Sequence, residues 1–160
     1  MESKSGSIFW GDGKEKNSER LELVHLDVCG PTTIKSLGGN LYFVSFIDDA
    51  SRKTWIYAFS QKSDVYHTFK KWKALVENET WNKIKCLKSQ NRGKYRYGGI
   101  VKRTPQKNGL AERMKRTIMG RARGMRIHVD LPLQFWVAAA DTAEYLIDRS
   151  PAKCSKWWYS

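Results

Sequence analysis

Three apolar segments near the start of the chain have the length and composition of β-strands. They cover residues 21–29, 41–47 and 53–59, and turn-forming residues separate them. Gly30-Pro31 ends the first segment, Gly38-Gly39-Asn40 precedes the second, and residues 48–51 follow it. Because the turns are short, the simplest arrangement of the three strands is an antiparallel meander.

A helix and a fourth strand are predicted next. The helix starts at Ser63-Asp64 and runs to about Thr80, with one apolar stripe formed by Val65, Phe69, Trp72 and Val76. Residues 83–88 alternate between polar and apolar positions, which is typical of a strand. After a helical crossover, this strand is expected to lie parallel to a neighbour.

Two further helices are predicted in the second half of the chain. A polar turn at residues 104–109 leads into a helix whose apolar positions are Leu110, Met114, Ile118, Ala122 and Met125. Another helix starts at residues 130–132 and stops by Pro151. The pattern predicts an α/β fold in which a mixed sheet, with strands one to three antiparallel and strand four parallel, carries flanking helices.

Length and composition favour one folded domain. The chain has 160 residues, of which 41% are hydrophobic and 12% aromatic, too many for a disordered basic tail. We expect a poorly ordered arm at residues 1–20, a core domain at 21–152 and a short tail at 153–160. No apolar run approaches the roughly 20 residues of a membrane span, and the N-terminus lacks a signal core. These features predict an intracellular protein with no membrane partner.

The positive charge of the chain is concentrated in one segment. The formal net charge is +13, and residues 81–126 contain fifteen Lys and Arg against one acid, Glu112. Such a segment favours a polyanionic partner, of which nucleic acid is the commonest. The alternative is a solvated basic face with no specific ligand. The three cysteines are far apart and are expected to be reduced thiols.

Four sequence blocks, in order, resemble the catalytic core of retroviral-type integrases. They are LELVHLDVCGP at residues 21–31, YFVSFIDDASR at 42–52, TPQKNGLAER at 104–113 and YLIDRSP at 145–151. The resemblance is specifically to the Pol polyproteins of copia-type retrotransposons. It implies a ribonuclease-H-like fold for residues 21–152 and a function in DNA integration by polynucleotidyl transfer.

The resemblance also implies a metal site. In that family two Asp and one Glu hold divalent cations, Mg²⁺ or Mn²⁺, and Asp27 and Glu112 stand at the first and last of these positions. Mg²⁺ is a hard cation that prefers carboxylate and phosphate oxygens. Asp27 and Glu112 are therefore the candidate catalytic residues and metal ligands.

The chain departs from the family pattern at the second carboxylate. Gln90 stands where the family has an Asp, so a neutral amide replaces an anion, and Lys94 replaces an acid. Only 21 residues separate Gln90 from Glu112, fewer than is usual in the family. The absent residues are those expected to form a short helix and the fifth strand. We therefore predict a truncated copy with impaired catalysis.

The remaining expectations concern partners. DNA is the expected partner, the nucleus is the expected location, and a homo-oligomer is left open. The residues expected to contact nucleic acid are Gln106, Lys107, Asn108, Arg113, Lys115 and Arg116.

Several alternatives remain. One is an active nuclease in which Asp48 or Asp49 replaces the lost acid, and another is a non-catalytic basic adaptor that binds nucleic acid. Glu112 has a structural interpretation as well, because an acid in the first turn of a helix gains about 0.3–1 kcal/mol from the helix dipole. His25 is expected to be a packed or hydrogen-bonded residue rather than a ligand.

Overall fold

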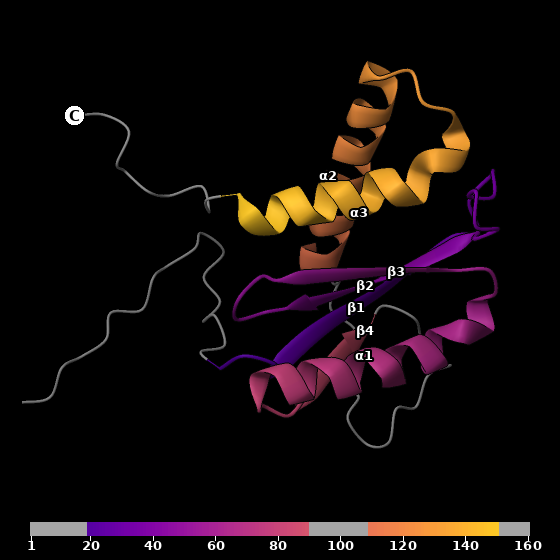
Figure 1. Cartoon of the computed structure of the whole chain (residues 1–160). Helices are drawn as coiled ribbons and strands as arrows, with labels where there is room; N and C mark the ends of the chain where they lie inside the picture. The colour runs from indigo at the N-terminus through magenta and orange to yellow at the C-terminus, as the bar shows by residue number, and fades with distance from the viewer. Residues whose placement is uncertain (1–18, 90–108, 151–160) are drawn as a thin grey trace, which may run out of the picture.

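The computed structural model describes residues 19–89 and 109–150 (Figure 1). In chain order the described elements are β1 (Leu23–Cys29), β2 (Tyr42–Asp48), β3 (Thr54–Phe59), the short 3₁₀ helix η1 (Lys62–Asp64), α1 (Val65–Thr80), β4 (Cys86–Ser89), α2 (Gly109–His128), the 3₁₀ helix η2 (Leu133–Phe135) and α3 (Trp136–Arg149). All seven predicted strands and helices are present. The expected N-terminal arm, the tail and the segment that contains Gln90 and Lys94 lie outside the described residues, apart from Glu19 and Arg20.

The four described strands form one sheet in the order β3-β2-β1-β4. β1 pairs antiparallel with β2 and parallel with β4, and β2 pairs antiparallel with β3. Asp27 lies opposite Ser45 on β2, and Leu26 lies opposite Ser89 on β4. The predicted mixed α/β sheet is confirmed, and β1 has a neighbouring strand on each side.

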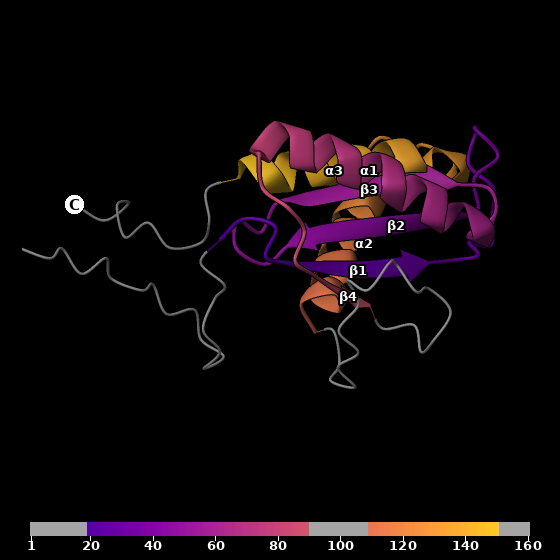
Figure 2. The same cartoon turned by 90° about the horizontal axis from the view of Figure 1, so that it is seen from below.

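Helices cover both faces of the sheet (Figures 1 and 2). α1 packs on one face, whereas α2 and α3 lie on the other. Side chains alternate along β1, so Val24 and Leu26 enter the core under α1. Asp27, two residues after His25, faces the α2 side of the sheet, where Lys115 meets it.

The core under α1 is built around Trp72. Its ring stacks on Phe46 with centroids 4.1 Å apart and planes 8° from parallel. Trp55 meets the same ring edge-on at 5.4 Å. The apolar stripe predicted for this helix is buried in full, which confirms that amphipathic spacing fixed the face that α1 turns to the sheet.

Two local predictions differ from the structure. The turn at Gly38-Gly39-Asn40 does not join two strands directly, because it lies inside a longer loop between β1 and β2. This loop docks on the start of α3, where the Trp136 indole donates to the carbonyl of Ile34 over 3.2 Å. In addition, β4 begins at Cys86 rather than at residue 83.

Glu77 explains the late start of β4. Its Oε1 accepts a hydrogen bond from the backbone N–H of Ile84 at 3.0 Å, so that N–H is not available to the sheet. Its Oε2 pairs with Lys73 at 3.1 Å and with Lys83 at 3.2 Å. Burial by itself would raise the pKa of Glu77, but these partners more than offset it and the pKa lies below its ordinary value. One buried carboxylate thus joins the end of α1 to the segment before β4.

A carboxyl pair joins α3 to β3. Oδ1 of Asp148 accepts the backbone N–H of Thr54 at 3.2 Å. Burial, together with the neighbouring Asp148 and Asp141, raises the pKa of Glu144 to about 7. A neutral Glu144 donates a hydrogen bond to Asp148, and ionisation of Glu144 would place two anions side by side. None of the described helices is long and apolar enough to cross a bilayer.

We expect Glu77→Gln to destabilise the protein by about 2 kcal/mol at pH 7, because it removes a buried anion that has three partners. The folded-state pKa is lowered, so this contribution is present above pH 4.5 and is lost as the pH falls through the folded pKa. Denaturant unfolding at pH 7 and at pH 3.5 measures it. Glu79→Gln, an exposed neighbour on α1, is the matched control and should change little.

We expect Glu144→Gln to stabilise the protein at pH 8 by about 1 kcal/mol, after allowance for solvent screening. Because the folded-state pKa of Glu144 is raised, ionisation of this carboxyl destabilises the folded protein as the pH rises from 4.5 to about 7. Gln cannot ionise, so it removes this penalty, and its amide can still donate a hydrogen bond to Asp148. Thermal unfolding at pH 4 and pH 8 checks this. An equal effect at both pH values would contradict the assignment.

Candidate functional site

Asp27 is held near the C-terminal end of β1 on the face covered by α2. The residue is only 6% exposed, and its register partner Ser45 is fully buried. A carboxylate at such a position is costly unless a charged or hydrogen-bonded partner compensates it. The side chains that α2 places on this face therefore determine how the charge of Asp27 is compensated.

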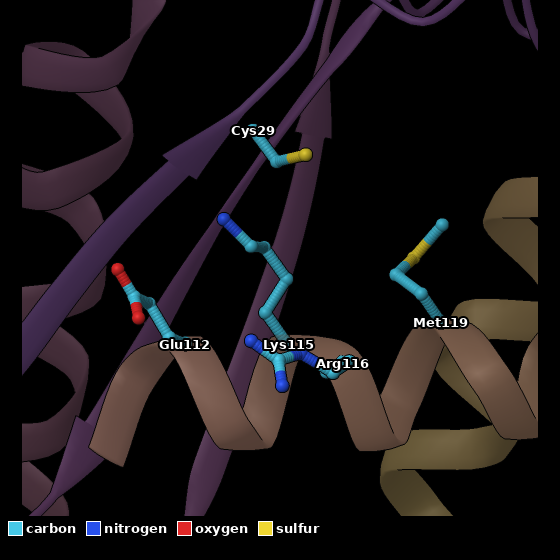
Figure 3. A pocket seen from close by; sticks show the side chains of 5 residues that line it. All are labelled: Cys29, Glu112, Lys115, Arg116 and Met119. Atoms are coloured by element: carbon cyan, nitrogen blue, oxygen red, sulfur yellow. The ribbon is translucent and has the colours of Figure 1, made fainter. Parts of the chain in front are cut away.

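α2 contributes four residues to the same surface. Glu112, Lys115, Arg116 and Met119 are spaced by three, four and seven positions, so they lie along one side of the helix. With Cys29 of β1 they line an open pocket of about 400 Å³ (Figure 3). Glu112 is half-buried in the first turn of α2, as predicted. Cys29 and Met119 were not predicted, because no motif distinguishes a strand cysteine or a helical methionine that faces a pocket.

The central contact of the site is an ion pair between Lys115 and Asp27. Nζ of Lys115 lies 2.8 Å from Oδ2 of Asp27, and the side chains are 30% and 8% exposed respectively. The contact joins an ammonium and a carboxylate, so the attraction is between opposite charges. In Figure 3 the Lys115 side chain extends from α2 toward β1, while Arg116 remains at the outer side of the helix.

The ion pair also sets the protonation of its neighbourhood. Burial by itself would lower the pKa of Lys115, but contact with Asp27 and the charge of that carboxylate outweigh burial and raise the pKa above its ordinary value. Burial raises the pKa of the Cys29 thiol, against the opposing charge of Lys115. At neutral pH the pocket therefore contains an ammonium ion and a protonated thiol.

The described residues do not fit the metal site that the resemblance implies. Nowhere in residues 19–89 and 109–150 do three or more His, Cys, Asp or Glu side chains gather in a metal-binding group. An oxygen of Asp27 that would face a cation already faces the Lys115 ammonium. Gln90, at the position of the second carboxylate, lies outside the described residues. The donors present are those of an internal ion pair, and we derive no metal-dependent step from them.

Asp48 and Asp49 have other partners. Oδ1 of Asp48 accepts the N–H of Leu21 at 3.0 Å and Oδ2 accepts that of Ser51 at 3.0 Å. Asp48 lies opposite Val24, three positions from Asp27, which is about 10 Å along a strand. Asp49 pairs with Arg52, at 3.3 Å, and with His25, at 3.1 Å. The contact of His25 is the one expected of a hydrogen-bonded histidine, and the structure provides no support for Asp48 or Asp49 as a substitute metal ligand.

The residues expected to contact nucleic acid are brought together only in part. Arg113 and Arg116 are exposed on α2, and Nε of Arg113 donates to the carbonyl of Gly109 at 3.4 Å. Lys115 is turned inward to Asp27. The other three, Gln106, Lys107 and Asn108, lie outside the described residues.

Comparison with known proteins gives consistent relatives, although no family model matches the sequence. The chain is 45% identical to the retrovirus-related Pol polyprotein from transposon TNT 1-94 of Nicotiana tabacum over 93% of its length. It is 34% identical to that from transposon RE2 of Arabidopsis thaliana, again over 93% of its length. The chain spans only 12% and 11% of the lengths of these two polyproteins.

A solved structure has the same fold. A chain in the cryo-electron microscopy structure of the simian T-cell lymphotropic virus intasome, in complex with PP2A regulatory subunit B56 gamma, matches with a TM-score of 0.64. The match is 13% identical and covers 88% of this chain and 54% of the other. The resemblance found in the four sequence blocks is confirmed. The chain is homologous to one segment of the retrovirus-related Pol polyproteins of plant copia-type transposons, and it has the α/β fold of an integrase core.

Proposed function

We propose that this domain is a nucleic-acid-binding integrase core whose strand-transfer chemistry is impaired. The observation that carries the proposal is the α2 face, where Arg113 and Arg116 are exposed and Arg116 lines an open pocket beside the ion pair of Asp27, the position of the family's first Asp. The relatives supply the context of DNA integration, since their names are those of transposon Pol polyproteins. The proposed partner is DNA, and the proposed location is the nucleus.

Charge supports binding to a polyanion. α2 carries four exposed arginines around its circumference, which are Arg113, Arg116, Arg121 and Arg123. Glu112 is the one acidic residue of that helix. Exposed guanidinium groups bind phosphate oxygens without reading the sequence, and they make affinity depend on salt. Arg113 and Arg116 are the strongest candidates because both lie next to Glu112 and Lys115.

Three features support impaired catalysis. Gln90 replaces an anionic ligand by a neutral one, and Lys115 pairs with the Asp27 carboxylate. The interval from Gln90 to Glu112 is short. The alignment with the tobacco relative runs over 163 positions, more than the 160 residues of this chain although only 93% of the chain is aligned. The relative therefore has residues within the matched span that this chain lacks, in agreement with a shortened interval.

A second candidate is the non-catalytic adaptor, which the Asp27–Lys115 pair also favours. In that case Asp27 and Glu112 serve only to hold α2 on the sheet, and DNA binding needs neither carboxylate nor metal. A homo-oligomeric state of the domain belongs to the first candidate. Glu112→Ala separates the two, because the adaptor should bind DNA unchanged with or without Mg²⁺.

We expect Arg113→Ala/Arg116→Ala to weaken binding of duplex DNA and to reduce the slope of log affinity against log salt by about two units, one for each lost phosphate contact. Fluorescence anisotropy between 50 and 200 mM salt in EDTA measures this. Lys62→Ala/Lys71→Ala removes the same charge from exposed positions on η1 and α1, at the opposite face of the sheet, and should leave the slope unchanged. Equal losses in both variants would count against a specific α2 face.

The impaired chemistry has its own test. We expect the purified wild-type protein and Asp27→Asn to show the same background in nicking and strand-transfer assays with Mg²⁺ or Mn²⁺. Activity that depends on Asp27 would overturn this part of the proposal and leave the DNA-binding part intact.

A further inference from the structure

Lys115 occupies the place of a cation at the Asp27 carboxylate. Its Nζ is 2.8 Å from Oδ2, the distance of a charge-assisted contact, and the carboxylate is almost fully buried. A Mg²⁺ ion bound to this oxygen would lie about 2.0–2.1 Å from it. The ammonium and the metal cannot both be at this oxygen, because two cations would then be in contact.

The geometry of α2 holds the ammonium in place. Lys115 is one helical turn after Glu112 and four residues before Met119, on the side of α2 that faces β1 (Figure 3). Ile118 and Ala122 of the same helix are buried against Ala140 and Ala143 of α3, which fixes the rotation of α2 about its axis. The four-carbon stem of Lys115 therefore reaches from a packed helix to the sheet and is not a freely moving surface chain.

From this geometry we propose that Lys115 is a built-in counter-ion that replaces the metal at Asp27 and excludes divalent cations from the site. The ligand of the Asp27 carboxylate is then an ammonium ion from the chain itself. Lys115 thus neutralises the charge of Asp27, as a bound metal would otherwise do, and no added ion is needed. The inference deepens the proposed function at the same site, but it concerns cation binding and not DNA binding.

The change that exposes the Asp27 oxygen is Lys115→Met, which keeps an unbranched apolar stem and removes the charge. Asp27 can then offer its carboxylate to a hydrated cation, a common way in which proteins hold Mg²⁺, and Glu112 lines the same pocket. The loss of one positive charge from the pocket also lowers the repulsion of a cation. Arg116→Met removes a charge from the same pocket without touching the ion pair, and is the matched control.

The experiment is a titration of the intact chain with Mn²⁺, followed by electron paramagnetic resonance and by thermal unfolding in the absence of DNA. The wild type and Arg116→Met should show no Asp27-dependent site at millimolar Mn²⁺. Lys115→Met should bind Mn²⁺ about tenfold more tightly or better and gain thermal stability from it, and Lys115→Met/Asp27→Asn should lose this binding.

Several results would overturn the proposal. They are an Mn²⁺ site in the wild type that Asp27→Asn removes, no gain in folded Lys115→Met, or an equal gain in Arg116→Met. If Lys115→Met does not fold, Lys115→Gln replaces it, since its amide can still donate to Asp27. If neither folds, the wild-type titration decides, because an Asp27-dependent site overturns the proposal and its absence supports it. DNA binding in EDTA is measured separately, so failure here is distinguishable from failure of the proposed function.

Discussion

The structure depends on how β1 accommodates a carboxylate in a strand that has neighbours on both sides. β1 is bonded to β2 and to β4, so its alternating side chains must enter one of two cores. Val24 and Leu26 enter the apolar core under α1, where a carboxylate without a partner would be costly. Asp27 enters the other side and requires a positive charge close to it. α2 supplies that charge through Lys115 and is thereby joined to the sheet by an ion pair as well as by apolar packing.

Much of this fold follows from periodicity. The first three strands follow from apolar content and the turn residues between them, and β4 follows from alternation. The apolar stripes of α1 and α2 recur with the period of a helix. The parallel placement of β4 follows from the helix that precedes it. Asp27 and Glu112 were found through sequence blocks, and the structure places them on facing elements.

The contacts that give the site its character were not predictable in the same way. Lys115 was expected to contact phosphate, because a sequence shows its charge but not the rotation and crossing angle with which α2 docks on the sheet. The sequence assigns Cys29 no role beyond that of a reduced thiol, although the residue lines the pocket. The link from Glu77 to Ile84 joins residues seven positions apart across the end of a helix, and no propensity scale contains it. These features arise from tertiary packing, and they are the ones that decide the chemistry.

The division of the sheet into two cores has a consequence for how such a chain changes over generations. Leu87 of β4 is buried in the core under α1, and Ile118 of α2 is buried in the core against α3. The interval between β4 and α2 therefore joins two separately packed layers. A change in the length of that interval removes no side chain that the described residues of either core bury. Selection for folding therefore constrains the two packed layers more strongly than the segment that joins them.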